Sequence, residues 1–151
     1  MFFKDRLVIE IGHHDIKILY ANSVNVSKCD TLEVAVGAVD NYKIVNTDIV
    51  YDVIDKYLID NKINDSKVSY VIDGSDISVR FMEVPVMNHK SIMELVKWEL
   101  NEYLPDLGSN SYFDYEITQK IKSEDKKVYK LFVVAVEKER IENLLGLNKR
   151  L

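Results

Sequence analysis

The sequence contains few of the residues from which most cofactor motifs are built. It has one cysteine, two prolines and five widely scattered glycines among 151 residues. A Walker A loop, a GxGxxG dinucleotide motif and a zinc site of paired cysteines each need such residues at short, fixed spacings. None of these motifs occurs. The single cysteine, Cys29, cannot form an internal disulfide, which agrees with a reducing compartment.

Long apolar segments and an excess of positive charge are also missing. The longest uninterrupted apolar run, residues 131–136, is far shorter than the about 20 residues of a membrane-spanning helix. Lys4, Asp5 and Arg6 follow the first three residues, and Glu10 interrupts the next apolar stretch, so the pattern of a secretory signal is absent. The net charge of −5 argues against a nucleic-acid-binding surface. We therefore expect a cytoplasmic protein without a direct membrane span and without a nucleic-acid partner.

The first half of the chain has the patterns of a small sheet followed by a helix. Alternating apolar residues at 7–11, 16–20 and 24–36 predict a three-stranded meander whose first turn contains Gly12. From Asn46 or Thr47, apolar residues recur every three or four positions and predict a surface helix of about four turns. Residues 68–72 then form a short apolar run that ends at a turn near Asp73 and Gly74.

The second half predicts the order strand, helix, strand, strand, helix. A strand over 77–84 ends at Pro85, and Asn88 caps a helix over 89–104 that ends at Pro105. Residues 112–121 and 127–136 predict a hairpin, and 137–145 a closing helix. The fold class is therefore α+β or α/β with mixed sheets. We expect the helix over 89–104 to cover the sheet near Val79, Tyr115 and Val133 with Ile92, Leu95, Val96, Tyr103 and the aliphatic part of Glu99.

The histidines and carboxylates do not form a convincing catalytic or metal-binding pattern. His13 and His14 are adjacent, so their side chains point in different directions on an extended backbone, and nothing in the sequence brings His89 to them. Glu99 and Glu102 have the spacing of a solvated helix face. We therefore expect a solvated turn at the histidines, an ordinary free thiol at Cys29 and no enzymatic chemistry.

The loop between the first two predicted strands is more suggestive. Glu10, Ile11 and Gly12 are followed by two polar residues and a return strand that carries Lys17. This arrangement is similar to the first phosphate loop of the actin-like ATPases, where backbone amides hold phosphate and a carboxylate orients magnesium through water. A plain hairpin turn is the alternative interpretation.

A longer pattern in the second half points to the same group of proteins. It consists of Asp73-Gly74, a strand over 77–85 that ends in Val-Pro, Met87 two residues later, Trp98-Glu99, and the segment Glu-Tyr-Leu-Pro at 102–105. Together with 113–115 and 133–139, it closely resembles the PilM family of type IV pilus assembly proteins, actin-like relatives of the cell-division protein FtsA. The resemblance covers nearly the whole chain, but only the amino-terminal part of the family.

The resemblance implies an architecture and a vestigial nucleotide site. Residues 1–74 would form an incomplete actin-like (ribonuclease H-like) first subdomain, and 75–151 the inserted FtsA-like strand-helix-strand-strand module with a return helix. Members of full length bind ATP and magnesium, whereas this chain would hold no cofactor. It would retain the first phosphate loop only in vestigial form, through Glu10, Gly12, His13, His14 and Lys17.

The resemblance also implies a function and a partner. The protein would be a cytoplasmic scaffold at the inner face of the cell membrane that docks the amino-terminal peptide of PilN and links the assembly platform to motor proteins. In the family this peptide lies between the first subdomain and the inserted module. The residues expected to line or support its groove are Val84, Pro85, Met87, Trp98 and Tyr103. Two alternatives remain open: an ATP-binding actin-like protein with nucleotide-dependent assembly, and an FtsA-like membrane-tethered protein, for which the expected terminal amphipathic helix is not found in this chain.

Overall fold

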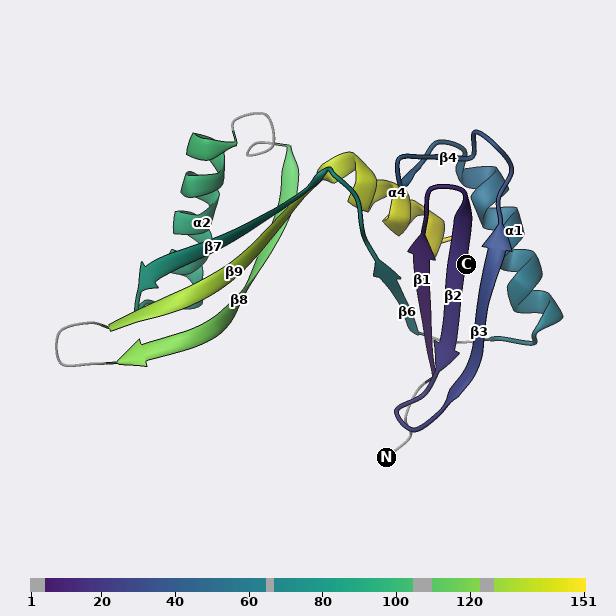
Figure 1. Ribbon diagram of the computed structural model, residues 1–151, viewed down its shortest axis with the longest axis horizontal. Helices are drawn as coiled ribbons and strands as arrows, with labels where there is room; N and C mark the ends of the chain where they lie inside the picture. Colours follow the sequence, from purple (N-terminus) through teal and green to yellow (C-terminus); the bar gives the residue numbers. More distant parts are fainter. Residues whose placement is uncertain (1–4, 65–66, 105–109, 123–126) are drawn as a thin grey trace. The chain divides into compact units, whose positions relative to one another are not determined.

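The computed structural model describes residues 5–64, 67–104, 110–122 and 127–151 (Figure 1). The chain divides into two units, one formed by Met1–Gly74 with Glu142–Leu151 and the other by Ser75–Ile141. Each unit has its own sheet and its own apolar core.

The first unit contains the meander that the sequence predicts, extended by one parallel strand. The sheet has the order β3-β2-β1-β6, in which β6 is parallel to β1 and the other pairs are antiparallel. A parallel neighbour requires a crossover connection, and helix α1 lies within the connection that leads to β6. A two-stranded hairpin of β4 and β5, which the sequence analysis did not anticipate, precedes α1. The elements are β1 (Arg6–Ile11), β2 (Asp15–Ala21), β3 (Val26–Glu33), β4 (Val39–Asp40), β5 (Lys43–Ile44), α1 (Thr47–Asp60) and β6 (Lys67–Val71).

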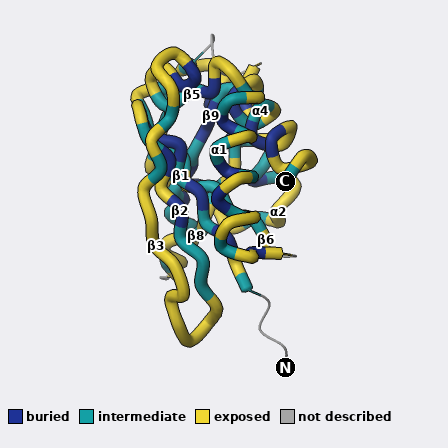
Figure 2. Tube along the Cα trace, turned by 90° about the vertical axis from the view of Figure 1, so that its right-hand side faces the viewer, coloured by how far each residue is buried: buried dark blue, intermediate teal, exposed yellow. Residues whose placement is uncertain are grey.

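Helix α1 begins where the sequence predicts. The Asn46 side chain accepts hydrogen bonds from the backbone amides of Asp48 and Ile49, at 3.1 and 3.2 Å, and so caps the helix. Figure 2 shows α1 on one side of the strands β1 to β3, while β3 is exposed along nearly its whole length. Most buried side chains of this core come from alternate positions of β1 and β2, from α1 and from the last turns of α4 (Lys138–Asn148), and the rest come from the β4–β5 region and from the loop after α1. The first group is Leu7, Ile9, Ile11, Ile16, Ile18, Val50, Ile54, Tyr57, Leu144 and Leu147, and the second is Ala38, Val39, Ile44 and Ile63.

The second unit is a three-stranded antiparallel sheet with a helix on one face. The sheet has the order β7-β9-β8, so that β9 is central. The predicted order strand, helix, strand, strand, helix is confirmed. Its elements are β7 (Ile77–Pro85), α2 (His89–Tyr103), β8 (Ser111–Lys122), β9 (Lys127–Glu137) and the start of α4. The Asn88 side chain caps α2 by accepting from the Ser91 amide at 2.9 Å, as predicted. Pro105, expected to end this helix, lies outside the described residues.

The face of α2 that packs on the sheet is only partly the one predicted. Ile92 and Val96 are buried as expected, but the third buried position is Leu100, which continues their spacing of four residues. Leu95 is only partly buried, and Tyr103 is 57% exposed, so the prediction that Tyr103 belongs to this core is wrong.

The prediction for Val79 is also wrong, because this residue faces away from α2. In β7 the side chains that face the helix are those of Arg80, Met82 and Val84, whereas Val79 is 49% exposed. Successive side chains of a strand point to opposite faces, so an error of one position reverses the whole strand. Over the described residues, no helix is long and apolar enough to cross a membrane.

Candidate functional site

The turn between β1 and β2 is the first candidate site, and Gly12 lies where its backbone approaches Asp15 closely. The Gly12 amide donates to the Asp15 carbonyl at 2.8 Å, which closes the turn tightly. A Cβ atom at position 12 would overlap the Asp15 carboxylate, which can rotate away, and would lie 3.1 Å from the Asp15 carbonyl oxygen, which is a tight contact with the backbone. The glycine is therefore explained by the close approach of its own turn, without any bound phosphate.

Glu10 and Lys17 are directly opposite each other across the β1–β2 pair. Lys17 Nζ donates to Glu10 Oε1 at 2.7 Å. This hydrogen bond, followed by the Coulombic attraction of the same carboxylate, raises the pKa of Lys17 above its ordinary value. The cation expected to contact phosphate is thus bonded to the carboxylate expected to orient magnesium, so a phosphate group would have to compete with Glu10 for it.

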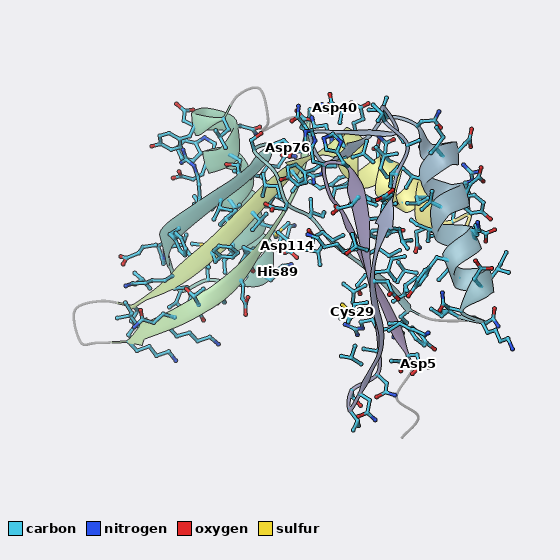
Figure 3. All side chains as sticks on the ribbon, turned by 45° about the vertical axis from the view of Figure 1, so that its right-hand side comes forward. Asp5, Cys29, Asp40, Asp76, His89 and Asp114 are labelled. Atoms are coloured by element: carbon cyan, nitrogen blue, oxygen red, sulfur yellow. The ribbon has the colours of Figure 1, made fainter. Side chains whose placement is uncertain are left out.

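His13 and His14 lie exposed in the same turn, with ring centroids 4.2 Å apart. The ring of His13 also stacks on the ring of Tyr42, with 6.0 Å between the two ring centroids. His89, labelled in Figure 3, belongs to the other unit. Its Nδ1 lies 2.6 Å from the hydroxyl oxygen of Tyr115. Within the described part of the chain, no three histidine, cysteine, aspartate or glutamate side chains are grouped to hold a metal ion.

The five residues expected at a peptide groove all lie in the second unit, but they differ in exposure. Val84 is 1% exposed and belongs to the core, and Met87 packs against that core. Pro85 is exposed at the end of β7, while Trp98 and Tyr103 on α2 are each 57% exposed. Val84 can therefore only support a binding surface, and Pro85, Trp98 and Tyr103 are the members of this set that a partner can reach.

Tyr103 already has a neighbour that orients its ring. The guanidinium carbon of Arg80 lies 4.8 Å from the centre of the Tyr103 ring, a cation–π contact between β7 and the last turn of α2. One ring face is occupied in this way, and the side chain remains more than half exposed. Tyr103 is thus held in place by Arg80 before any partner binds.

The sequence analysis missed a hollow of about 600 Å³ between α2 and β8. Its lining is mainly apolar and includes three lysines, Lys90, Lys97 and Lys138. The Ser111 side chain is 7% exposed, and its hydroxyl has no hydrogen-bond partner among the residues described. The lining residues are Lys90, Met93, Glu94, Lys97, Asn101, Ser111, Tyr112, Phe113 and Lys138. In the sequence, only the spacing of the lining residues from α2 indicates that they share one side of the helix. These residues recur every three or four positions: Lys90, Met93, Glu94, Lys97 and Asn101.

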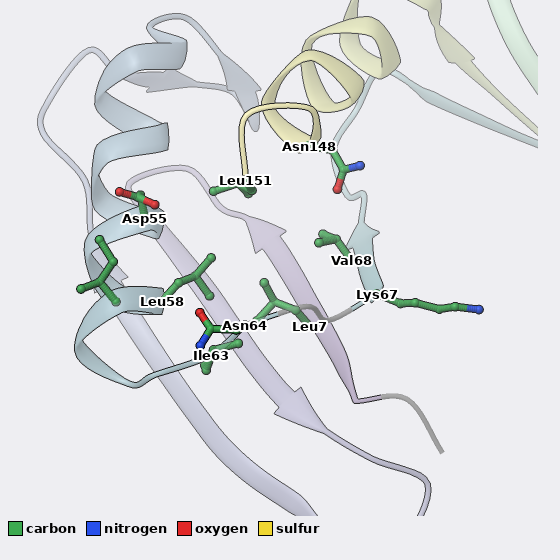
Figure 4. A pocket seen from close by; sticks show the side chains of 10 residues that line it. Leu7, Asp55, Leu58, Ile63, Asn64, Lys67, Val68, Asn148 and Leu151 are labelled. Carbon is green, nitrogen blue, oxygen red and sulfur yellow. The ribbon is translucent and has the colours of Figure 1, made fainter. Parts of the chain in front are cut away.

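A second hollow of about 600 Å³ lies in the first unit, between the end of α1 and the starts of β1 and β6 (Figure 4). Its lining includes apolar side chains such as Leu7, Leu58 and Val68 and the charged residues Asp55 and Lys67, and Leu151 lies beside it. Among the lining residues that the structure describes, no acid and base groups are in hydrogen-bond contact, and we assign the hollow no chemistry.

Comparison with known proteins finds this architecture in a solved structure. No model of a protein family matches the sequence, and no curated protein matches it. Among solved structures, a chain of a "PilM-PilN type IV pilus biogenesis complex" matches with a TM-score of 0.80 over 96% of this chain, at 18% sequence identity. This chain has the fold of the matched part of that protein.

The match covers 44% of the PilM–PilN chain, so the present chain spans less than half of that protein's length. Both units take part, since nearly all of the chain is aligned. The α+β fold class, and the resemblance to PilM that the sequence suggests, are confirmed at the level of the fold.

Proposed function

We propose that this chain forms part of a PilM-type scaffold of type IV pilus assembly that docks the amino-terminal peptide of a PilN protein. The observation that carries the proposal is the match of both units to a chain from a PilM–PilN complex. The segment over 73–105, which resembles the PilM family in sequence, forms β7 and α2 in the structure. Sequence pattern and fold therefore support the same family independently.

Three reachable side chains on β7 and α2 are proposed to contact the peptide: Pro85, Trp98 and Tyr103. Large aromatic side chains are the usual anchors of binding surfaces, because they bury much area with few rotatable bonds. Met87 and Val84 would support them from the core side. The peptide must become ordered on binding, so we expect micromolar affinity or weaker.

The scaffold is proposed to act without catalytic chemistry, in the cytoplasm at the inner face of the membrane, linking an assembly platform to motor proteins. The bonded pair of Lys17 and Glu10 supports this view, because it occupies the groups that nucleotide binding at the β1–β2 turn would need.

The test is a titration of a PilN amino-terminal peptide into isotope-labelled protein, followed by amide chemical shifts. We expect shifts around α2 and the end of β7, and an affinity about tenfold weaker for Trp98→Ala, as for a binding anchor. Phe81→Ala is the matched control, because Phe81 is a more exposed aromatic of the same unit on the sheet face opposite α2. Absence of shifts at millimolar peptide, or equal losses in both variants, would contradict the proposal.

A further inference from the structure

The face of the second sheet that points away from α2 carries an apolar patch that the described part of the chain leaves exposed. Phe81 is 77% exposed and Val79 is 49% exposed, both on β7. Their partners on the central strand are Phe132 and Val134, and the rings of Phe81 and Phe132 lie 5.4 Å apart. A continuous apolar patch of this kind on a monomer is typical of an interaction surface.

The third strand gives this face a charged border. Asp114 pairs with Val134 and Glu116 pairs with Phe132, so each apolar row of two residues ends in a carboxylate on β8. Both carboxylates are exposed, and Asp114 is labelled in Figure 3. The next row holds Glu83 beside Lys130, with 4.0 Å between Oε1 and Nζ, and therefore adds no net charge.

We propose that this face, defined by Val79, Phe81, Phe132, Val134, Asp114 and Glu116, is a docking surface for an amphipathic helix with a basic flank. One face of an antiparallel sheet is commonly solvated and polar, but an apolar face is normally buried against another layer, as α2 covers the opposite face here. A helix about 10 Å wide spans two strands spaced about 4.8 Å apart. Lying over β7 and β9, it would place one flank above the β8 carboxylates.

Charge complementarity favours a basic helix over two other possible occupants, an anionic lipid surface and a second copy of this chain. An anionic lipid surface would be repelled by Asp114 and Glu116, whereas lysine or arginine on the helix flank would pair with them. A second copy of the chain, docked through the same face, would place its own Asp114 and Glu116 near those of the first copy, and the like charges would repel each other. Of the residues proposed to contact the PilN peptide, Trp98 and Tyr103 lie on α2, and only Pro85 shares this face of β7. The docking surface includes none of the three, so this proposal does not depend on the proposed function.

The test uses the full chain and an amphipathic helical peptide of leucine, alanine and lysine, of about 18 residues or five turns. Its acidic counterpart carries glutamate in place of lysine, and phosphatidylglycerol vesicles form a third probe. We expect amide shifts on β7, β8 and β9 with the basic peptide, at least about fivefold weaker binding of the acidic one, and decreasing affinity with added salt.

Two variants and a control make the outcome decisive. Phe81→Ser should weaken binding of the basic peptide about tenfold, as loss of an aromatic anchor does. Asp114→Asn combined with Glu116→Gln should weaken it about three- to tenfold and reduce the salt dependence. Val36→Ser, which changes a residue 98% exposed in the first unit, should have no effect. Shifts elsewhere, no binding at millimolar peptide, equal affinity for both peptides, vesicle binding that requires Phe81, or a dimer that Phe81→Ser dissociates would each overturn the proposal.

Discussion

Arg140 Nη1 donates to Asp76 Oδ1 and thereby joins the entry of the second unit to its exit, 64 residues later in the sequence. The two side chains are 5% and 14% exposed. An ion pair so far removed from water depends on both partners, because either charge alone would be strongly penalised. This contact closes the second unit at the point where the chain enters β7 and leaves β9.

Removing one partner of this pair should therefore be costly. We expect Arg140→Ala to reduce the free energy of unfolding by about 3 to 5 kcal/mol. The control is Arg150→Ala, which breaks an exposed pair with Asp48 at 2.7 Å and a cation–π contact with Tyr51 at 4.3 Å. It should cost at most about 2 kcal/mol for the two contacts together. Urea denaturation of both variants measures the difference, and equal losses would show that burial does not strengthen the dependence on Arg140.

Helix α2 provides a second test of packing. Leu100 is 2% exposed in the core of the second unit, so Leu100→Ala should destabilise it by about 2 to 5 kcal/mol. Leu95 is only partly buried, and Leu95→Ala should cost less, about 1 to 2 kcal/mol. The exposed Leu145 serves as a control, in Leu145→Ala. A larger loss for Leu95 than for Leu100 in thermal or urea denaturation would mean that the helix is rotated.

The helices could be predicted from the sequence because their signals are local. Asn46 and Asn88 are capping residues immediately before apolar stripes of helical spacing, and both accept the expected backbone hydrogen bonds. The hairpin turn at Gly12 was equally local, and the opposition of Glu10 and Lys17 follows from its register.

The faces of β7 could not be predicted in the same way. Ile77, Val79 and Phe81 alternate as buried residues do, but Met82 and Val84 on the other face are apolar as well. The choice is made by tertiary contacts, since Arg80 pairs with Tyr103 of α2 while Met82 and Val84 pack in the core. The hollow between α2 and β8 depends likewise on residues from separate elements. Phe81 lies on the same face of β7 as Val79, the residue wrongly predicted to face the helix, and is exposed for the same reason.

The β1–β2 turn leads to a prediction on nucleotides. Lys17 is bonded to Glu10, and a plain tight turn accounts for Gly12, so we expect no measurable ATP hydrolysis and at best millimolar binding, about −4 kcal/mol. Calorimetric titration with magnesium and ATP measures this, with Lys17→Ala as the matched variant. Micromolar affinity that Lys17→Ala abolishes would restore the phosphate-loop interpretation.

Two tyrosines of the first unit, Tyr57 and Tyr70, have a raised pKa and should lose their hydroxyl protons only at a pH above the ordinary range. Burial raises the pKa of Tyr70 to about 12. Burial, followed by the hydrogen bond that the Tyr57 hydroxyl donates to Asp30 Oδ2 at 2.6 Å, raises the pKa of Tyr57 further. The neutral forms are favoured in the folded state, so this contribution to stability is complete below the ordinary pKa of 10.0 and is lost as the pH rises from there towards 12.

Tyr70→Phe isolates this effect. In the described structure the Tyr70 hydroxyl is buried without a hydrogen-bond partner, so its removal at neutral pH should leave stability unchanged or raise it by about 1 kcal/mol. The variant should also lose one late group from the ultraviolet titration of tyrosinate and retain more of its stability between pH 10 and 12. Tyr112→Phe, which changes a 46% exposed ring, should leave the late phase intact. If Tyr70→Phe instead loses about 2 kcal/mol at neutral pH, the hydroxyl has a partner on which the unit depends, because only a satisfied buried hydroxyl is costly to remove.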